Sequence, residues 1–127
     1  MRALVSLGAV LVSLAAPAAA AQIHAFDDAA FHALQAQNAP AIVFVHAPWC
    51  PICRAQEQTL RKLIAIPKYQ KLTVLTIDFD SQKPLWTRFG VKQQSTLIAY
   101  HGRREAARLA FDSDPQKVTA LVDASLR

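Results

Sequence analysis

The sequence contains only two cysteines, Cys50 and Cys53, and no second cysteine pair. A structural zinc site uses about four ligands, usually with a second cysteine or histidine pair at a defined spacing. The histidines show no such spacing and are scattered along the chain at His24, His32, His46 and His101. The sequence therefore argues against a zinc site, and we expect neither a bound metal nor another cofactor.

A membrane-spanning apolar run is also lacking. Residues 3–16 are apolar apart from two serines and one glycine, and this run is shorter than the ~20 residues that a transmembrane helix needs. Arg2 precedes the run, whereas Pro17 and the small residues 18–21 follow it. This order is typical of a secretory signal peptide that is cleaved after its small residues. An uncleaved membrane anchor is the alternative.

The chain therefore divides into a signal peptide at residues 1–21 and one domain at residues 22–127. A domain of this length can bury a core of its own, and it contains no repeat, low-complexity tract or linker. No cysteine lies near the expected cleavage site, so nothing indicates a lipid anchor. We expect a periplasmic or secreted protein without stable membrane association once the signal is removed.

The charges do not indicate a nucleic-acid partner. The formal net charge is +5. So modest a positive charge mainly affects solubility. The one basic cluster, Arg103 and Arg104 with Arg108, lacks the interleaved aromatic residues of a nucleic-acid-binding surface. We expect no nucleic-acid partner, and we expect a monomer.

Helical and strand-like patterns alternate along the domain. Residues 41–45 form a continuous apolar, β-rich run, which is typical of a central strand buried on both faces. Capping residues, prolines and apolar spacing predict the remaining elements. These are a short strand at 23–25, a helix from Asp27 or Asp28 to about Asn38, a helix from Cys50 to before Pro67, a strand at 72–77, a short helix from 81 or 82 to 89, hairpin strands at 96–100 and 105–111, and a last helix that Asp114 caps.

This order of elements predicts the fold class. Strands that are separated by helices pair in parallel, whereas a hairpin adds antiparallel strands. We therefore expect an α/β fold with a mixed central β-sheet and helices on both faces.

Residues 49–53 read Trp-Cys-Pro-Ile-Cys and open the helix that follows the central strand. Cys50 falls at the helix N-terminus, where unpaired backbone N–H groups and the helix dipole favour an anion. The thiolate is the reactive form of cysteine, so this placement is expected to lower the pKa of Cys50 and activate it. Cys53 lies one turn further on and can attack a mixed disulfide that Cys50 forms.

Two neighbours are candidates for tuning this thiolate. Arg54 adds a positive charge close to the motif, and His46 lies four residues before Cys50 at the end of the strand. As an imidazolium, His46 would stabilise the thiolate, although a packing or surface histidine is the alternative.

A redox-active pair, a structural disulfide and a metal site are the three interpretations of Cys50 and Cys53. A bridge between cysteines only three residues apart closes a short loop and stabilises a fold little. A strand that leads directly into the Cys-x-x-Cys motif, followed at once by a helix, favours the redox-active pair.

Beyond residues 49–53, three further segments, 78–80, 89–91 and 95–97, match those that follow the motif in the thioredoxin family, and the resemblance spans the whole domain. The resemblance implies a thioredoxin fold and thiol–disulfide exchange with protein substrates. It implies Cys50 as nucleophile, Cys53 as resolving thiol and Trp49 as a docking residue beside them. The substrate would dock on a rim formed by Trp49, Ile52 and the loop at Ser95 and Thr96. Plain core packing is the alternative for Trp49.

The chain also departs from that family. Ser95 stands where many members have a cis-proline. The cost of a cis bond without proline favours a trans peptide before Ser95, but the sequence leaves cis and trans open. Ser95 either gives its hydroxyl to the thiolate or is an ordinary loop serine.

Phe44 and Thr76 replace an aspartate and a lysine behind the resolving cysteine, so the usual proton acceptor is missing. Glu57 is a possible substitute through water, but a solvated surface glutamate is the simpler interpretation.

The sequence therefore predicts an exported thiol–disulfide oxidoreductase that works with protein thiols or disulfides and an unidentified redox partner. The cysteines enclose Pro51 and Ile52, and the Ile52 side chain offers the thiolate no hydrogen bond or charge, which favours a reductant over an oxidant. The alternative is a non-enzymatic binding module that keeps Cys50 and Cys53 as a structural disulfide.

Overall fold

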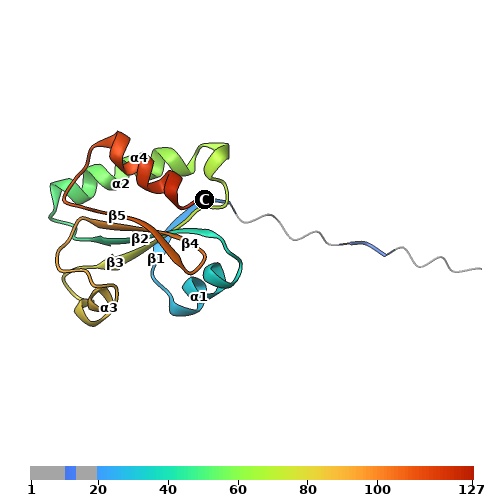
Figure 1. The fold of residues 1–127 in the computed structure, drawn as a ribbon, viewed down its shortest axis with the longest axis horizontal. Helices are drawn as coiled ribbons and strands as arrows, with labels where there is room; N and C mark the ends of the chain where they lie inside the picture. The colour runs from blue at the N-terminus through green and yellow to red at the C-terminus, as the bar shows by residue number, and fades with distance from the viewer. Residues whose placement is uncertain (1–10, 14–19) are drawn as a thin grey trace, which may run out of the picture.

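A five-stranded β-sheet runs through the middle of the structure, a computed structural model that describes residues 11–13 and 20–127 (Figure 1). Most of the signal peptide expected at residues 1–21 lies outside the described residues and stays a prediction. Within the described part of the chain, no helix is long and apolar enough to cross a membrane.

The elements alternate as the sequence predicts. In chain order they are β1 (Gln22–Ala25), α1 (Asp28–Ala36), β2 (Pro40–His46), α2 (Pro51–Ile64), the 3-10 helix η1 (Pro67–Tyr69), β3 (Thr73–Asp78), α3 (Lys83–Arg88), β4 (Thr96–His101), β5 (Arg104–Ala110) and α4 (Pro115–Ala124). The strand order in the sheet is β1-β3-β2-β4-β5. β3 pairs in parallel with β1 and β2, whereas β4 is antiparallel to β2 and β5. The mixed α/β sheet is therefore confirmed.

Helices cover both faces of the sheet, with α2 and α4 on one face and α1 and α3 on the other (Figure 1). Alternate residues of β2 point to opposite faces of the sheet, as successive side chains of a strand do. Ile42 and Phe44 pack in the cluster with α2 and α4, whereas Val43 and Val45 pack in the cluster with α1 and α3. All four are fully buried, which explains why this strand is apolar without alternation.

Element boundaries differ from the sequence-based expectation most clearly at the end of the last strand, whereas the first two helices end before the prolines that follow them. Helix α1 ends at Ala36, and Pro40 is the first residue of β2, a position where a strand tolerates proline. Helix α2 ends at Ile64, and Pro67 begins η1. The last strand was expected to include Phe111 but stops at Ala110, because Phe111 has a positive φ of 55° and leaves the strand.

Gly102, in the β4–β5 hairpin, is a site where a side chain would not fit. Its φ is +58°, and a Cβ there would lie 2.6 Å from Asn38 Oδ1 and 3.1 Å from Asn38 Cα. The Asn38 side chain can move away, but its backbone cannot. Gly90 has a similar φ of +67°, yet its nearest heavy atom, on Arg108, would be 3.9 Å from the Cβ.

We therefore expect Gly102→Ala to lower the free energy of unfolding by more than the matched Gly90→Ala change. The positive φ alone costs about 1–3 kcal/mol in either variant, and only Gly102→Ala adds the clash with the Asn38 backbone. Urea unfolding of both variants measures the difference. Equal losses would contradict the steric part of this account.

Candidate active site

The sulfur of Cys50 caps the N-terminus of α2. Cys50 has an extended backbone, and its Sγ accepts a hydrogen bond from the backbone N–H of Cys53 at 3.2 Å. Pro51 occupies the first helical turn, where its missing N–H costs nothing. The sulfur therefore takes the place of the oxygen that usually caps a helix, and it faces the positive end of the helix dipole.

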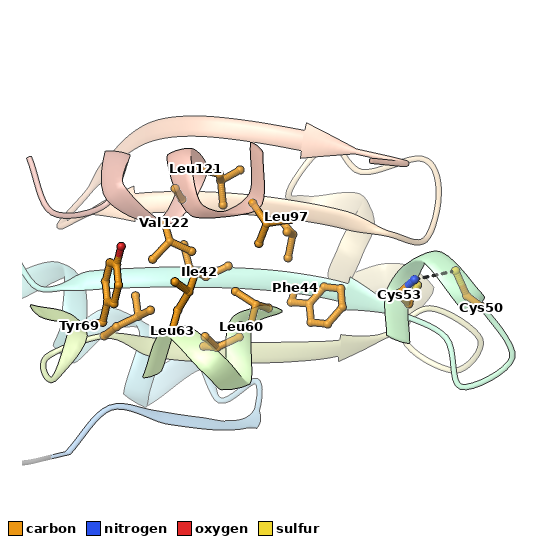
Figure 2. Packing of buried hydrophobic residues seen from close by; sticks show 14 of the residues in the cluster. Ile42, Phe44, Cys50, Cys53, Leu60, Leu63, Tyr69, Leu97, Leu121 and Val122 are labelled. Atoms are coloured by element: carbon orange, nitrogen blue, oxygen red, sulfur yellow. Dashed lines mark hydrogen bonds between the residues drawn. The ribbon is translucent and has the colours of Figure 1, made fainter. Parts of the chain in front are cut away.

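Both cysteines lie at one end of the core formed with α2 and α4, with Phe44 the next labelled side chain along it (Figure 2). Cys50 is 3% exposed and Cys53 is 2% exposed, and the two sulfurs are not bonded to each other. The dithiol form of the site is thus almost closed to water.

The hydroxyl of Ser95 bridges the two sulfurs. Ser95 Oγ lies 3.0 Å from Cys50 Sγ and 3.0 Å from Cys53 Sγ. One hydroxyl carries one proton and two lone pairs, so it can donate to one sulfur while it accepts from the other thiol. Of the two interpretations of Ser95, the structure matches the one in which the hydroxyl reaches the cysteines.

The surroundings give the two thiols different acidities. Burial alone would raise the pKa of Cys50, but hydrogen bonds from the Cys53 thiol, the Ser95 hydroxyl and the backbone N–H groups of Ile52 and Cys53 lower it below the ordinary value. Burial raises the pKa of Cys53, and the neighbouring Cys50 raises it further. Cys50 is therefore the thiol that ionises first and Cys53 the one that keeps its proton, which matches a nucleophile and a resolving thiol.

The backbone at Ser95 has an uncommon conformation. Its φ is +60°, which is rare for residues other than glycine, and the part of the chain that the structure describes has no cis peptide bond. The peptide before Ser95, which the sequence left open between cis and trans, is trans. The Ser95 carbonyl accepts hydrogen bonds from the backbone N–H of Phe111 at 3.1 Å and from Gln56 Nε2 at 3.0 Å.

Gln56 had no role in the sequence-based prediction. It is fully buried on α2, one turn beyond Cys53, and its Nε2 also donates to the Asp112 carbonyl at 3.0 Å. The sequence did show that Gln56 is a polar residue on the same apolar face of the helix as Leu60 and Leu63. That signal identifies a buried glutamine but not its partners, which are distant in sequence.

Trp49 lies on the surface beside Cys50. It is 56% exposed, and its indole N–H donates to the Asp80 carboxylate oxygens at 2.9 and 3.2 Å. The core-packing alternative for Trp49 is therefore wrong. Ile52 is half-buried and packs against the core, so an apolar rim of Trp49 and Ile52 borders the cysteines.

The loop before β4 contributes less to this rim than expected. Ser95 is fully buried and Thr96 is 3% exposed, and the Thr96 hydroxyl donates to the Gln93 carbonyl at 2.9 Å. Their side chains point inward, which corrects the expectation that they line the rim. Docking at this loop would use its backbone groups.

The expected tuning residues make no contact with the thiols. The His46 ring is half-buried 5.3 Å from the Phe44 ring, and the Arg54 guanidinium donates to the Pro48 carbonyl. Among the described residues, no hydrogen bond or ion pair joins either side chain to a cysteine. Their role in tuning is a prediction that the geometry does not support.

No buried base lies behind Cys53 in the positions that the sequence singled out. Phe44 is fully buried, and the Thr76 hydroxyl donates to the His24 carbonyl. Glu57 forms a surface ion pair with Arg61 at 2.6 Å, which agrees with a solvated glutamate. Across residues 11–13 and 20–127, no three histidine, cysteine or acidic side chains gather as a metal site.

Comparison with known proteins agrees with this geometry. The family model of thioredoxin matches residues 22–124. A protein of Dictyostelium discoideum named as a thioredoxin, thioredoxin-5, is 32% identical over 75 residues, which cover 58% of this chain and 71% of that protein. The protein disulfide-isomerase erp38 of Neurospora crassa is 31% identical over 68 residues, which cover 52% of this chain but only 18% of that longer protein.

A solved structure extends the likeness to most of the chain. The crystal structure of Trxlp from Edwardsiella tarda EIB202 is 41% identical, covers 80% of this chain and 96% of Trxlp, and superposes with a TM-score of 0.72. The five-stranded mixed sheet and its four helices match that structure. From the motif, the fold and these matches, the chain belongs to the thioredoxin family of thiol–disulfide oxidoreductases.

Proposed function

We propose that this protein is an exported oxidoreductase that exchanges dithiol and disulfide with protein substrates through Cys50 and Cys53, more as a reductant than as an oxidant. The observation that carries the proposal is the environment of the Cys50 sulfur. It caps α2, accepts from the Cys53 N–H and lies 3.0 Å from the Ser95 hydroxyl. All of these contacts favour the thiolate.

In the first step the Cys50 thiolate attacks one sulfur of a substrate disulfide. The new bond joins Cys50 to the substrate, and the other substrate sulfur leaves with the electron pair of the broken bond and takes a proton from water. Cys53 stays protonated during this step because burial holds its pKa above the ordinary value.

In the second step Cys53 attacks the Cys50 sulfur. The Cys50–Cys53 disulfide forms, and the bond to the substrate breaks, so the substrate leaves with both sulfurs reduced. The substrate sulfur leaves with the electron pair of the broken bond and takes up the proton that Cys53 gives up, either through water or through the Ser95 hydroxyl, which lies 3.0 Å from Cys53 Sγ. An outside dithiol partner must then return two electrons to the pair.

The substrate would dock on the rim of Trp49 and Ile52. An exposed indole beside a nucleophile offers apolar area to a peptide, and the Asp80 carboxylate holds the ring by its N–H. Because Trp49 and Ile52 belong to the segment that carries Cys50, a docked peptide would lie against the sulfur.

The direction of electron flow rests on how strongly the reduced form is stabilised. Ile52 gives the thiolate no side-chain hydrogen bond or charge, which favours a reductant. The Ser95 hydroxyl acts the other way, since a hydrogen bond that stabilises the thiolate favours the dithiol. The two effects oppose each other. We therefore expect a reduction potential above that of thioredoxin and well below that of a strong periplasmic oxidant.

Substitution of each cysteine tests the exchange mechanism. We expect Cys50→Ser to abolish the protein's acceleration of insulin reduction by dithiothreitol, because the nucleophile is lost. Cys53→Ser should instead accumulate mixed disulfides with the substrate, visible by mass spectrometry. Full function of both variants would support the binding module with a structural disulfide.

A redox titration tests the direction. In graded glutathione buffers we expect the wild-type pair to titrate above the ~ −270 mV of thioredoxin but far below about −120 mV. Ser95→Ala should move the potential in the reducing direction, by about 30 mV for each tenfold change in the equilibrium constant. A wild-type value near the upper figure would contradict the reductant assignment.

Export is tested by expressing the whole chain with a C-terminal tag in a Gram-negative bacterium. We expect a periplasmic product that lacks the signal, with mass spectrometry placing its first residue at Ala21 or Gln22. The matched Leu11→Arg variant should stay full-length, because a charge interrupts the apolar run. A full-length wild-type chain in the membrane fraction would indicate an uncleaved anchor instead.

A further inference from the structure

Gln56 is a buried polar side chain with one half of its amide unsatisfied. Its Nε2 donates to two carbonyl oxygens, those of Ser95 and Asp112, each at 3.0 Å. Two acceptors around one atom require an NH₂ group there, so the orientation of the amide is determined. Oε1 is therefore the remaining atom, and it is buried with no hydrogen-bond partner among the described residues.

This arrangement is a poor way to stabilise a helix against a sheet. A buried acceptor that loses its bonds to water and finds no replacement costs stability. A methionine or leucine of similar volume would fill the same space on the apolar face of α2 without that cost. The reason for a glutamine must therefore lie in what its two N–H groups hold.

One of these groups holds the strained peptide that carries Ser95. The positive φ of Ser95 is unfavourable, so surrounding contacts must maintain it. Its carbonyl accepts from Gln56 Nε2 and from the Phe111 N–H, and these two bonds fix the plane of the peptide. The Ser95 side chain branches from the same residue, so rotation of the backbone would move Oγ away from the sulfurs.

The second N–H of Gln56 binds another loop. Asp112 follows Phe111 after β5, so Gln56 binds both the Ser95 carbonyl and the segment whose Phe111 N–H is the second donor to that carbonyl. Gln56 also lies one turn beyond Cys53 on the same buried face of α2. Through this one amide, the helix that bears the cysteines is connected to the loop that bears the bridging hydroxyl.

We propose that Gln56 is a positioning residue whose amide holds the Ser95 backbone so that the Ser95 hydroxyl stays between the sulfurs of Cys50 and Cys53. Gln56 touches neither sulfur through a hydrogen bond and acts only through Ser95. The inference rests on the proposed function, because it matters only if Cys50 reacts as a thiolate.

The test compares the volume-matched Gln56→Met with Gln58→Met, which changes an exposed glutamine on the same helix. Each reduced protein is alkylated with iodoacetamide across a pH series, and mass spectrometry of the Cys50 peptide gives the rate. We expect Gln56→Met to slow alkylation at pH 6 about threefold, because the thiolate loses a hydrogen bond, and Gln58→Met to leave the pH profile unchanged.

Ser95→Ala supplies the decisive comparison. On its own it should slow alkylation at least as much as Gln56→Met. Combined with Gln56→Met, it should give no further loss, since Gln56 acts through the hydroxyl that is already gone. Losses that multiply in the double variant would overturn the proposal.

Thermal melts separate positioning from a merely structural role. We expect Gln56→Met to melt at or above the wild-type temperature while its pH profile shifts. A lower melting temperature with an unchanged profile would overturn the proposal. Gln56→Leu is the second variant to use if Gln56→Met does not fold, and the same outcomes apply to it.

Failure of the proposed function would look different. Wild-type protein that alkylates as expected but does not reduce insulin would leave the Gln56 result standing and refute the exchange of disulfides with proteins. Wild-type protein that reduces insulin, with no effect of Gln56→Met or Gln56→Leu on alkylation, would refute only the positioning role.

Discussion

The hydrogen bond from the Cys53 N–H to the Cys50 sulfur joins the fold to the chemistry, and the rest of the site depends on it. A helix needs an acceptor at its N-terminus, and here that acceptor is the nucleophile. A thiolate accepts better than a thiol, so ionisation of Cys50 strengthens the end of α2, and the helix end in turn favours ionisation. One contact therefore caps a helix and favours the reactive thiolate.

That contact is placed by the central strand. β2 lies between β3 and β4 and is buried from Pro40 to Val45, so its C-terminal end is rigid. The chain leaves this end, makes a turn at residues 48–49 and begins α2. The helix packs against the core that contains Phe44 (Figure 2). The hairpin strand β4 begins just after Ser95 beside the same end of β2, which brings the hydroxyl to the sulfurs. The site is the meeting point of two segments that the sheet holds in register.

The sequence predicts the parts of this site that depend on local chemistry. The apolar run at 41–45, the helix after Cys50 and the caps at Asp27 and Asp114 all follow from neighbouring residues, and the structure has them. The contact between Gln56 and Ser95 joins residues 39 positions apart, so no local pattern could reveal it. The positive φ of Ser95 is likewise maintained by distant partners, and the Trp49 indole N–H finds its acceptor on Asp80, 31 positions away.

The site has a neutral hydroxyl beside its two cysteines and Phe44, not an acid, behind Cys53, and this combination changes what the site can do well. A carboxylate behind the resolving cysteine could hold the proton that Cys53 gives up, whereas the Ser95 hydroxyl can only pass a proton on while it keeps one of its own. In this position it stabilises the pair of thiol and thiolate in the reduced protein, through equal contacts of 3.0 Å to both sulfurs. Its contribution therefore belongs to the equilibrium between dithiol and disulfide more than to the rate of resolution. On this mechanism the residues that fix the hydroxyl tune the redox potential, and they do so from positions that never touch a substrate.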